Sequence, residues 1–386
     1  MKIGIVTFYR VANYGAMLQA YALRRFLESM GHEVVFVSHP RLVSSRIPLW
    51  KCFVSRHLKG VVIKLKRYVR HSMTEFAASY PQTKFCQTMA EVREATADCD
   101  AFVVGSDQMW KPLWCSGAHL PLVMLDFADI GKPRIAYAVS FGTTVWCEDQ
   151  GAELAGELLR KFSRISVREE SGVKLVNELS GRSDAVCLLD PTLLHSADFY
   201  REIISSGNAS VPRRARPTIF RYVLDEWDDP ETTQKAFEFV RGKLGFPDVD
   251  SDRIAVCGFL GPLCKLLGVT AKVSVPLWLA KIAASDFVFT NSFHGTVFAL
   301  LFHKPFVTLL LRGGMSGMNE RVLSLLKKLG LESRAAYADD VASLELALAT
   351  PIDWEKVEVA RMGSAEESVA FLQESLRNEH GVQIIC

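Results

Sequence analysis

One histidine stands where side chains often take part in catalysis. His294 lies in the run "FTNSFHGTVFALLF" (289–302), where a strand-like apolar stretch gives way to a helical one that Asn291 or Ser292 can cap. A histidine beside a helix N-terminus sees partial positive charge, and the same charge attracts anions. Because imidazole titrates near neutral pH, His294 could bind or protonate an anionic substrate. Taken alone, the local pattern favours a buried histidine beside a cap.

Two arginines follow other strand-like runs. Arg168, in "SVREESG", comes after a predicted strand, and a guanidinium fork there can hold a carboxylate or a phosphate at two points. A surface ion pair with a neighbouring glutamate is the competing interpretation. Arg312 opens the glycine-rich stretch "LRGGMSGMNER", which fits a mobile loop over a cleft or a plain linker. The other polar candidates in that stretch are Asn319 and Arg321.

Two loops in the first third of the chain have the composition of a sugar site. "YRVANYGAMLQAY" (9–21) joins the first strand to a helix through Asn13, Tyr14 and Gly15, and glycine allows close approach of a ligand to the backbone. It lacks the GxGxxG spacing of a dinucleotide fingerprint. The second loop, "VVGSDQMW", places polar groups beside an aromatic ring: Ser106, Asp107, Gln108 and Trp110. Each loop fits an ordinary strand-to-helix turn about as well.

These candidates follow hydrophobic runs that alternate with helical ones. The predicted strands lie within 2–8, 33–39, 99–110, 134–142, 165–170, 185–194, 218–224, 253–257, 286–290 and 304–311. Helical periodicity between them favours parallel strands with crossover helices. Because ligands of doubly wound sheets bind at the carboxyl ends of the strands, the polar strand exits should meet. The sequence predicts an α/β protein with two Rossmann-like domains facing a cleft.

The length of 386 residues suits two domains. We place the first at 1–206, a linker at 207–217 ("GNASVPRRARP") and the second at 218–386, whose last helix, near 363–378, could return to the first domain. Two domains with a cleft suit an enzyme that takes two substrates.

Composition narrows the class of protein. Hydrophobic residues make up 49% and charged residues 23%, and no stretch of about 18–20 apolar residues could span a membrane. "MKIGIVTFYR" reads as a buried strand rather than a signal peptide, so we expect a cytoplasmic protein. The nine cysteines are scattered, without CxxC or zinc spacing, so we expect reduced thiols and no metal.

The positive charge is concentrated in one segment. Between Glu33 and Glu75 the chain has nine cations and no acidic residue, although its net charge is only +2. Apolar residues and cations alternate through 41–71, as in helices that lie on membrane surfaces. A helix with a solvated basic face is the simpler interpretation. We expect no nucleic-acid binding, because the rest of the chain is net acidic and no binding module is visible.

Six stretches together resemble the polysaccharide pyruvyl transferase family. They are "GIVTFYRVANYGAMLQAYALRRFLESMGHEV", "VVGSDQMWKP", "RIAYAVSFG", "SVREES", "LLDPTLL" and "ASDFVFTNSFHGTVFALLFHKPF". They occur in the order of the family, and the resemblance runs from residue 3 to about residue 335. The resemblance implies a GT-B-like pair of domains and transfer of the enolpyruvyl group of phosphoenolpyruvate onto two sugar hydroxyls, without a cofactor or metal.

The resemblance also implies roles for the candidate residues. His294 would be the general acid, and Arg168 would hold phosphoenolpyruvate. Some branches carry an arginine where this chain has Ser292, so Arg312 or Arg321 would supply a further contact to the donor. The remaining donor-side residues would be Gly295, Thr296 and Asn319. The acceptor-side residues would be Asn13, Tyr14, Gly15, Ser106, Asp107, Gln108 and Trp110.

Three hypotheses about function follow. The first is a ketal pyruvyltransferase of capsule or exopolysaccharide synthesis, whose acceptor sugar is linked to undecaprenyl diphosphate; a lipid-linked acceptor would account for the basic segment. The second is a nucleotide-sugar-dependent glycosyltransferase of the same architecture, in which "RGGMSGMNE" holds a diphosphate and Glu320 a ribose. The third is a saccharide-binding protein without catalysis. We favour the first, because the ordered stretches outweigh one glycine-rich loop.

Overall fold

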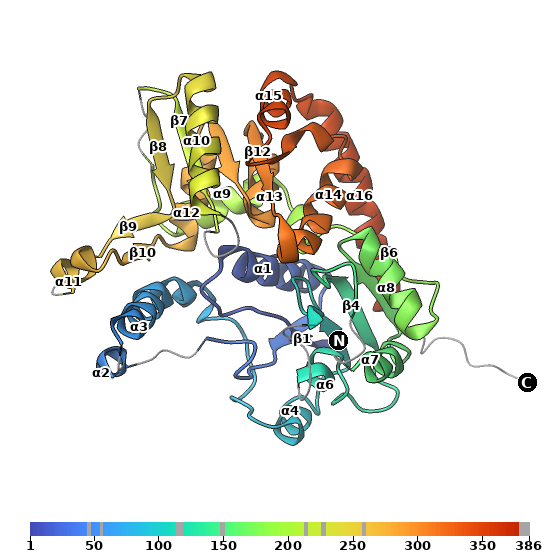
Figure 1. Cartoon of the computed structure of the whole chain (residues 1–386). Coiled ribbons are helices and arrows are strands. Elements are labelled where there is room, and N and C mark those ends of the chain that lie inside the picture. The colour runs from blue at the N-terminus through green and yellow to red at the C-terminus, as the bar shows by residue number, and fades with distance from the viewer. Residues whose placement is uncertain are drawn as a thin grey trace, which may run out of the picture.

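The computed structural model of the protein describes residues 1–44, 48–54, 57–112, 119–146, 151–211, 215–224, 229–256 and 260–377. It contains two parallel β-sheets covered by helices, one above the other in Figure 1. Parts of the predicted basic segment (45–47 and 55–56), of the predicted linker (212–214) and of the predicted last helix (378) lie outside the described residues.

The first sheet has the strand order β2-β1-β3-β4-β5-β6, and each neighbouring pair is parallel. Its strands are β1 (Lys2–Val6), β2 (Glu33–Phe36), β3 (Ala101–Val104), β4 (Arg134–Val139), β5 (Arg164–Val167) and β6 (Val186–Cys187). Strands β3 and β4 are buried throughout, as expected for a parallel sheet covered on both faces. The described α-helices within residues 1–206 are α1 (Tyr14–Ser29), α2 (Leu49–Phe53), α3 (Leu58–Arg70), α4 (Met89–Ala95), α6 (Leu120–Val123), α7 (Ala152–Leu159), α8 (Glu170–Ser180) and α9 (Ala197–Ser206), of which α9 lies beside the second sheet in Figure 1. The described 3₁₀ helices of this range are η1 (His71–Ala77) and η4 (Pro191–Leu194).

The second sheet has the order β13-β12-β11-β7-β8, again with parallel neighbours. Its strands are β7 (Thr218–Tyr222), β8 (Asp248–Ser251), β11 (Phe287–Thr290), β12 (Phe306–Leu310) and β13 (Ala335–Tyr337). Its helices are α10 (Pro230–Leu244), α11 (Gly261–Leu266), α12 (Val275–Ala284), α13 (Phe293–Leu301), η5 (Gly313–Asn319), α14 (Glu320–Lys328), η6 (Glu332–Arg334), α15 (Val341–Ala349) and α16 (Trp354–Ser375).

One predicted strand of the second half does not join the second sheet. The run predicted at 253–257 contributes β9 (Arg253–Ala255), which pairs with β10 (Thr270–Lys272) in a separate antiparallel ribbon. The sheet edge is taken instead by β8, whose sequence "DVDS" has no apolar run. An edge strand has one neighbour and a wet side, so it can form without the apolar pattern of a buried strand.

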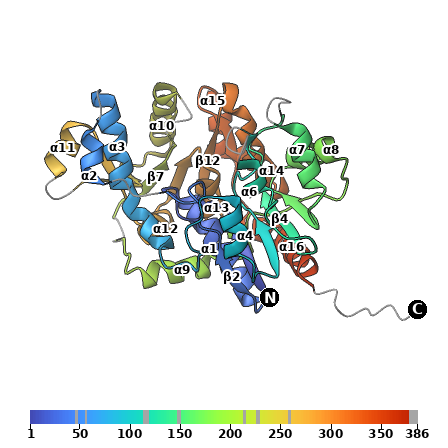
Figure 2. The same ribbon diagram turned by 90° about the horizontal axis from the view of Figure 1, so that it is seen from below.

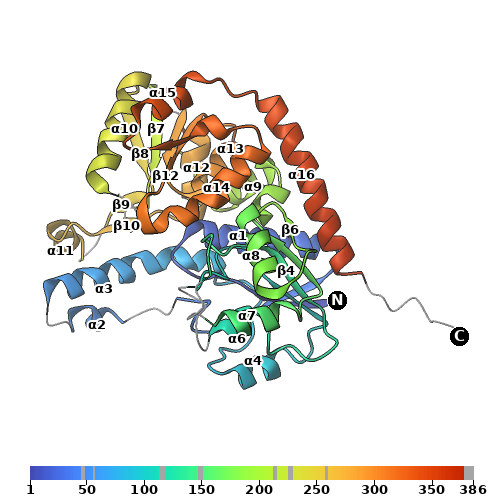
Figure 3. The same ribbon diagram turned by 45° about the vertical axis from the view of Figure 1, so that its right-hand side comes forward.

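The last helix returns to the first sheet. In Figure 3, α16 runs from the second half down along the first. Ser368 Oγ accepts a hydrogen bond from Leu189 N at 3.2 Å, and Arg361 Nη1 donates to Leu193 O at 2.7 Å. The two halves therefore share one continuous hydrophobic core, which runs from Ile3 to Leu376.

The basic segment forms a projection with part of the second half. Helix α3 buries Leu65 and Val69 against Leu260, Cys264 and Val269, which lie in and around α11. Helices α2, α3 and α11 lie together at one end of the molecule in Figure 1 and, seen from below, in Figure 2. Within the described residues, no helix is both long enough and apolar enough to cross a bilayer.

Candidate active site

Asp190 stands at the centre of the candidate site. It follows β6 and caps η4, where Thr192 donates its backbone N–H (3.0 Å) and its hydroxyl (2.6 Å) to Oδ1. Oδ2 accepts from Arg168 Nη1 at 2.7 Å and from Ser106 Oγ at 3.0 Å. Burial alone would raise the pKa of this carboxyl, but His294, Arg168 and Thr192 together hold it well below its ordinary value. Asp190 is therefore a buried carboxylate that stays ionised.

Arg168 brings positive charge to this carboxylate from the end of β5. Its side chain is only 1% exposed, and its Nη2 lies 3.4 Å from Oδ1 of Asp107. The guanidinium carbon lies 4.8 Å from the centre of the Phe293 ring, a cation–π contact between the two halves. Nε has no hydrogen-bond partner among the described residues. An anion that reached Arg168 could supply that missing bond.

His294 reaches the same carboxylate from the opposite sheet. It lies in the first turn of α13, which Ser292 caps by accepting from Gly295 N at 3.4 Å. Nε2 of the ring is 3.6 Å from Oδ2 of Asp190 and has no hydrogen-bond partner among the described residues. On the other side of the ring, a Cβ placed on Gly15 would come within 1.9 Å of Nδ1. The imidazole is thus held between Asp190 and the first turn of α1.

A second buried arginine lies against the same aromatic ring. Arg321, in the first turn of α14, has its guanidinium carbon 5.8 Å from the centre of the Phe293 ring. With the Gln108 amide oxygen turned toward it, this oxygen accepts from both terminal nitrogens at 2.6 and 2.7 Å. Burial, with the nearby charge of Arg168, lowers the pKa of Arg321 to about 10. Burial and the charge of Arg321 also lower the pKa of Lys111. Three basic side chains thus gather between the two sheets.

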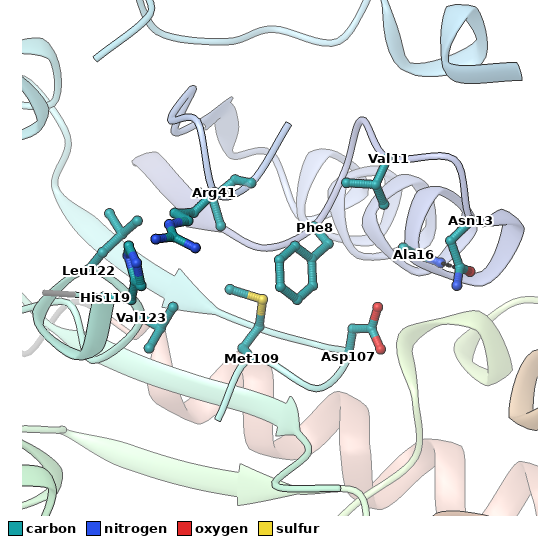
Figure 4. A pocket seen from close by; sticks show the side chains of 11 residues that line it. Phe8, Val11, Asn13, Ala16, Arg41, Asp107, Met109, His119, Leu122 and Val123 are labelled. Atoms are coloured by element: carbon teal, nitrogen blue, oxygen red, sulfur yellow. Dashed lines mark hydrogen bonds between the residues drawn. The ribbon is translucent and has the colours of Figure 1, made fainter. Parts of the chain in front are cut away.

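A cavity of about 570 Å³ adjoins this cluster. Asn13 and Asp107 lie at one end of it, and Phe8 and Met109 line its middle (Figure 4). Because Asp107 also contacts Arg168, the cavity extends up to the cluster. Its size and its mixture of apolar walls with a few polar groups are typical of small-molecule sites.

Residues 13–311 match the polysaccharide pyruvyl transferase family. This protein is a member of that family. The match covers most of the chain and includes every strand exit that contributes to the cluster. Membership identifies a transferase that acts on a sugar or polysaccharide acceptor. No curated protein matches the chain.

Solved structures show the fold that this pyruvyl transferase family member shares. UDP-GlcNAc 2-epimerase from Neisseria meningitidis, bound to UDP-GlcNAc, is similar over 97% of this chain and 99% of its own, with a TM-score of 0.51 and 10% identity. The enzyme of the same name from Methanocaldococcus jannaschii has a TM-score of 0.50 and 9% identity, over 97% of this chain and 100% of its own. UGT89C1 from Arabidopsis thaliana has a TM-score of 0.50 and 10% identity, over 97% of this chain and 99% of its own. At these identities the likeness shows the fold alone, and it confirms the predicted GT-B-like α/β arrangement.

The fold of the family member brings most of the predicted site residues together. Around Asp190 and the adjoining cavity lie Asn13, Gly15, Ser106, Asp107, Gln108, Arg168, Ser292, His294, Gly295 and Arg321. Their division into donor ligands and acceptor ligands stays a prediction.

Three predicted residues serve the core instead. Trp110 is fully buried and donates from Nε1 to Val123 O at 3.1 Å, so its ring offers no face to a sugar, contrary to our expectation. Tyr14 is also buried, and its ring stacks on Trp278 at 4.7 Å. The hydroxyl of Thr296 is 2.6 Å from that of Thr308 beneath α13.

Two more predicted donor ligands lie away from the cluster. The side-chain amide of Asn319 makes two hydrogen bonds of 2.8 Å to the backbone of Leu311, which fix the turn between β12 and α14. Arg312 is exposed, where it pairs with Asp339 at 2.6 Å and lies over the ring of Tyr337. The shape of this turn explains the difference, because it directs Arg312 toward β13 rather than toward Arg168.

Four residues of the cluster were not among the predicted site residues: Asp190, Phe293, Lys111 and Glu169. Only Asp190 had a local signal, an acidic residue directly before a proline in the strand exit "LLDP". Glu169 is buried beside Arg168; Oε1 accepts from Phe141 N at 2.7 Å, and burial raises its pKa. Among the described residues, no group of His, Cys, Asp and Glu could hold a metal ion. The expectation of a metal-free reaction stays a prediction.

Proposed function

We propose that the protein is a ketal pyruvyltransferase, which moves the enolpyruvyl group of phosphoenolpyruvate onto two hydroxyls of one sugar in capsule or exopolysaccharide synthesis. One observation carries the proposal: His294 and Arg168, from opposite sheets, meet at the buried carboxylate of Asp190. This contact joins a candidate acid and an anion-binding fork in one cluster, beside a cavity of suitable size for a sugar.

Phosphoenolpyruvate carries a carboxylate and a phosphate, and the cluster offers basic groups for both. Arg168 has an unpartnered Nε, and Arg321 lies against the same Phe293 ring. The N-terminus of α13 adds the partial positive charge of a helix end, which favours an anion. Because the side chains of the cluster are nearly buried, we expect the contacts between α14 and the loop after β3 to open for the donor.

His294 would supply the proton that starts the reaction. The carboxylate of Asp190 stabilises positive charge on the imidazole, so the ring can protonate the methylene carbon of phosphoenolpyruvate. A sugar hydroxyl then attacks the neighbouring carbon, phosphate leaves, and a second hydroxyl closes the ketal. Of the two hydroxyl protons, one replaces the proton that His294 gave and the other leaves with phosphate. Phosphoenolpyruvate is a co-substrate, and this route uses no further cofactor.

The cavity is the place we assign to the acceptor. Asn13 and Asp107 lie at its end next to Arg168, where their polar groups can bind sugar hydroxyls. Ser106 binds Asp190, and Gln108 binds Arg321, so these two side chains position the charged groups of the site. We propose a sugar of a polysaccharide precursor linked to undecaprenyl diphosphate as the acceptor.

We further propose that the projection of α2, α3 and α11, the α2–α3 tip, contacts a membrane surface. Among its described side chains, four apolar ones are exposed, with exposed fractions from 48 to 82%: Trp50, Phe53, Ile63 and Leu266. Exposed lysines accompany them, and Lys51 lies over the ring of Trp50. Exposed apolar and basic groups together suit an anionic bilayer. The packing of α3 against α11 makes the tip a folded projection rather than a free helix.

The membrane proposal is tested with the triple variant Trp50→Ser, Lys51→Gln, Lys59→Gln. The two lysines alone should contribute about 2 kcal/mol to binding of anionic vesicles, so we expect affinity to fall about 30-fold or more. Sedimentation with phosphatidylcholine/phosphatidylglycerol vesicles measures it. The matched control replaces two exposed lysines of α10, Lys235 and Lys243, with glutamine. Equal loss in both variants would mean that only net charge matters, and unchanged binding would remove the membrane contact.

Thermal stabilisation separates this proposal from the two other hypotheses. Phosphoenolpyruvate should raise the melting temperature of a pyruvyltransferase, whereas a nucleoside diphosphate should do so for a nucleotide-sugar-dependent glycosyltransferase. A saccharide-binding protein without catalysis would be stabilised by saccharide and release no phosphate from phosphoenolpyruvate.

The deciding experiment is phosphate release from phosphoenolpyruvate with a panel of lipid-linked or aryl galactosides, mannosides and N-acetylmannosaminides. Wild type, His294→Ala and the control His303→Ala are run together; His303 is an exposed histidine in the second half. We expect acceptor-dependent release that falls about 10²–10⁴-fold in His294→Ala and persists in His303→Ala. Near-wild-type activity of His294→Ala would refute the assignment of the acid.

A further inference from the structure

The cavity beside the cluster has a basic end opposite its catalytic end. Figure 4 shows Arg41 and His119 next to each other on one side, with Asp107 and Asn13 on the other. The walls between them are apolar and include Phe8 and Met109. A ligand that fills the cavity would therefore meet hydroxyl-binding groups at one end and positive charge at the other.

Within the part of the chain that the structure describes, the basic end has no acidic partner. His39 adjoins it, and its Nδ1 accepts from the backbone N–H of Arg41 at 3.3 Å. Among the described residues, no carboxylate oxygen lies within 4.0 Å of the side-chain nitrogens of His39, Arg41 or His119. The pKa of His119 is lowered by burial and by the charge of Arg41, and that of His39 by burial and by both neighbours. The fixed charge of Arg41, with no carboxylate beside it among the described residues, favours the binding of an anion.

The anion at this end must belong to a ligand larger than phosphoenolpyruvate. A cavity of about 570 Å³ is in the range that holds drug-sized ligands, and the donor has its own cations at Arg168 and Arg321. If the reacting hydroxyls lie near Asp107, the anomeric end of the sugar points along the apolar walls toward Arg41. The substituent on the anomeric carbon is where a carrier joins a sugar.

We propose that the Arg41–His119 end of the cavity binds the phosphate groups of a glycosyl diphosphate, so that the acceptor is recognised while still joined to its carrier. This rests on the proposed pyruvyltransferase function, and it adds a second binding subsite with named residues for the diphosphate of the acceptor. Arg41 supplies a fixed charge and a two-point fork for phosphate oxygens. His119 adds a hydrogen bond and, when protonated, a second charge.

The test is direct binding in the absence of phosphoenolpyruvate, so that it does not depend on turnover. Calorimetry with geranyl diphosphate, UDP and a neutral aryl glycoside as probes compares wild type, Arg41→Gln and the control Arg216→Gln. Arg216 is an exposed arginine at the start of β7 that pairs with Asp248. We expect Arg41→Gln to weaken at least one diphosphate about 10–100-fold, because a charged hydrogen bond is lost, and to leave the aryl glycoside unchanged. His119→Gln should weaken the same diphosphate less.

The outcomes separate the two possible carriers and the two proposals. Loss of geranyl diphosphate binding indicates a lipid carrier, loss of UDP binding a nucleotide carrier, and either result supports the subsite. The subsite is refuted if wild type binds neither diphosphate, or if Arg41→Gln and Arg216→Gln bind them equally. Phosphate release with neutral aryl glycosides tests the pyruvyltransferase function separately, so either proposal can fail while the other stands.

Discussion

Two arginines follow strands at corresponding places in the two sheets, and the fold uses them differently. Arg168 comes directly after β5, and Arg312 comes two residues after β12. The shortest ion pair of each arginine has nearly the same length, 2.7 Å from Arg168 to Asp190 and 2.6 Å from Arg312 to Asp339. The side chain of Arg168 is 1% exposed, however, and that of Arg312 is 58% exposed. The length of an ion pair therefore does not tell the two exits apart, whereas burial does.

The difference shows what makes a strand exit a site. Water and salt screen the exposed pair of Arg312, so it can break and re-form at little cost. The buried pair of Arg168 cannot be separated without leaving an unpaired charge, so its geometry is fixed. Arg168 also meets Phe293 and, through Asp190, His294 from the opposite sheet. In this molecule, a strand exit contributes to the candidate site when its side chain contacts residues of the opposite half.

The largest expected effect is the difference in kcat/KM between Arg168→Ala and Arg312→Ala. Arg168→Ala should lower kcat/KM for phosphoenolpyruvate about 10²–10³-fold, because a preorganised two-point anion contact is lost. It should change KM for the acceptor much less, since the donor carries both anionic groups. Arg312→Ala should stay within about threefold of wild type in both, because its charge is exposed and screened. Steady-state kinetics with each substrate varied measures the contrast.

Arg168→Lys controls for charge alone. Lysine keeps the positive charge but loses the planar fork, so its activity should fall between those of wild type and Arg168→Ala. Equal losses in Arg168→Ala and Arg312→Ala would show that the buried exit has no special role in donor binding. Equal rises in both KM values for Arg168→Ala would instead place Arg168 outside the donor site.

The two arginines also show which features of the site can be predicted from the sequence. Strand exits are readable from apolar runs, so Arg168 and His294 could be named as candidates and do meet in the structure. Their common partner Asp190 lies 22 residues from one and more than 100 from the other, so no local pattern joins the three. Whether Arg312 faces the cluster or solvent depends on a turn that Asn319 fixes through Leu311. Such long-range choices depend on tertiary packing.

The sequence also does not show how Trp110 and the basic segment pack, because both depend on residues far away in the chain. Trp110 stands beside polar residues in the sequence, but its indole packs inward and donates to Val123 O. Helix α3 has the alternation of a surface-binding helix, yet its apolar side meets Val269 and Cys264, some 200 residues away. Composition and periodicity predict that a face is apolar; they do not predict what covers it.

A second prediction compares the aspartates of the two exits. Asp190→Asn removes the nearer and fully buried of the two carboxylates that pair with Arg168, so we expect the free energy of unfolding at pH 7 to fall by about 3–5 kcal/mol. Because the folded-state pKa of Asp190 lies below its unfolded value of about 3.9, its stabilising contribution is complete above that value and declines as pH falls. The difference between wild type and Asp190→Asn should therefore shrink steadily below about pH 4. Urea denaturation at a series of pH values measures it.

Asp339→Asn is the matched control for this pH series. Its carboxylate is exposed, so the substitution should change the free energy of unfolding less than Asp190→Asn at every pH above 4. A difference between wild type and Asp190→Asn that stayed constant down to pH 2.5 would mean that ionisation of Asp190 is not its source. A similar loss in both variants would remove burial as the distinction between the exits.

The smallest expected effect tests how closely the buried site is packed. In Gly15→Ala, the new Cβ would lie 1.9 Å from Nδ1 of His294, so the ring must move. A displacement of this size should lower kcat about 10–100-fold. Helix propensity does not oppose this change, because alanine favours a helix over glycine by about 1 kcal/mol. Gly314→Ala makes the same change just after Arg312, where a Cβ meets nothing within 4 Å, and should leave kcat unchanged. If Gly15→Ala were as active as Gly314→Ala, His294 would not need its present position for catalysis.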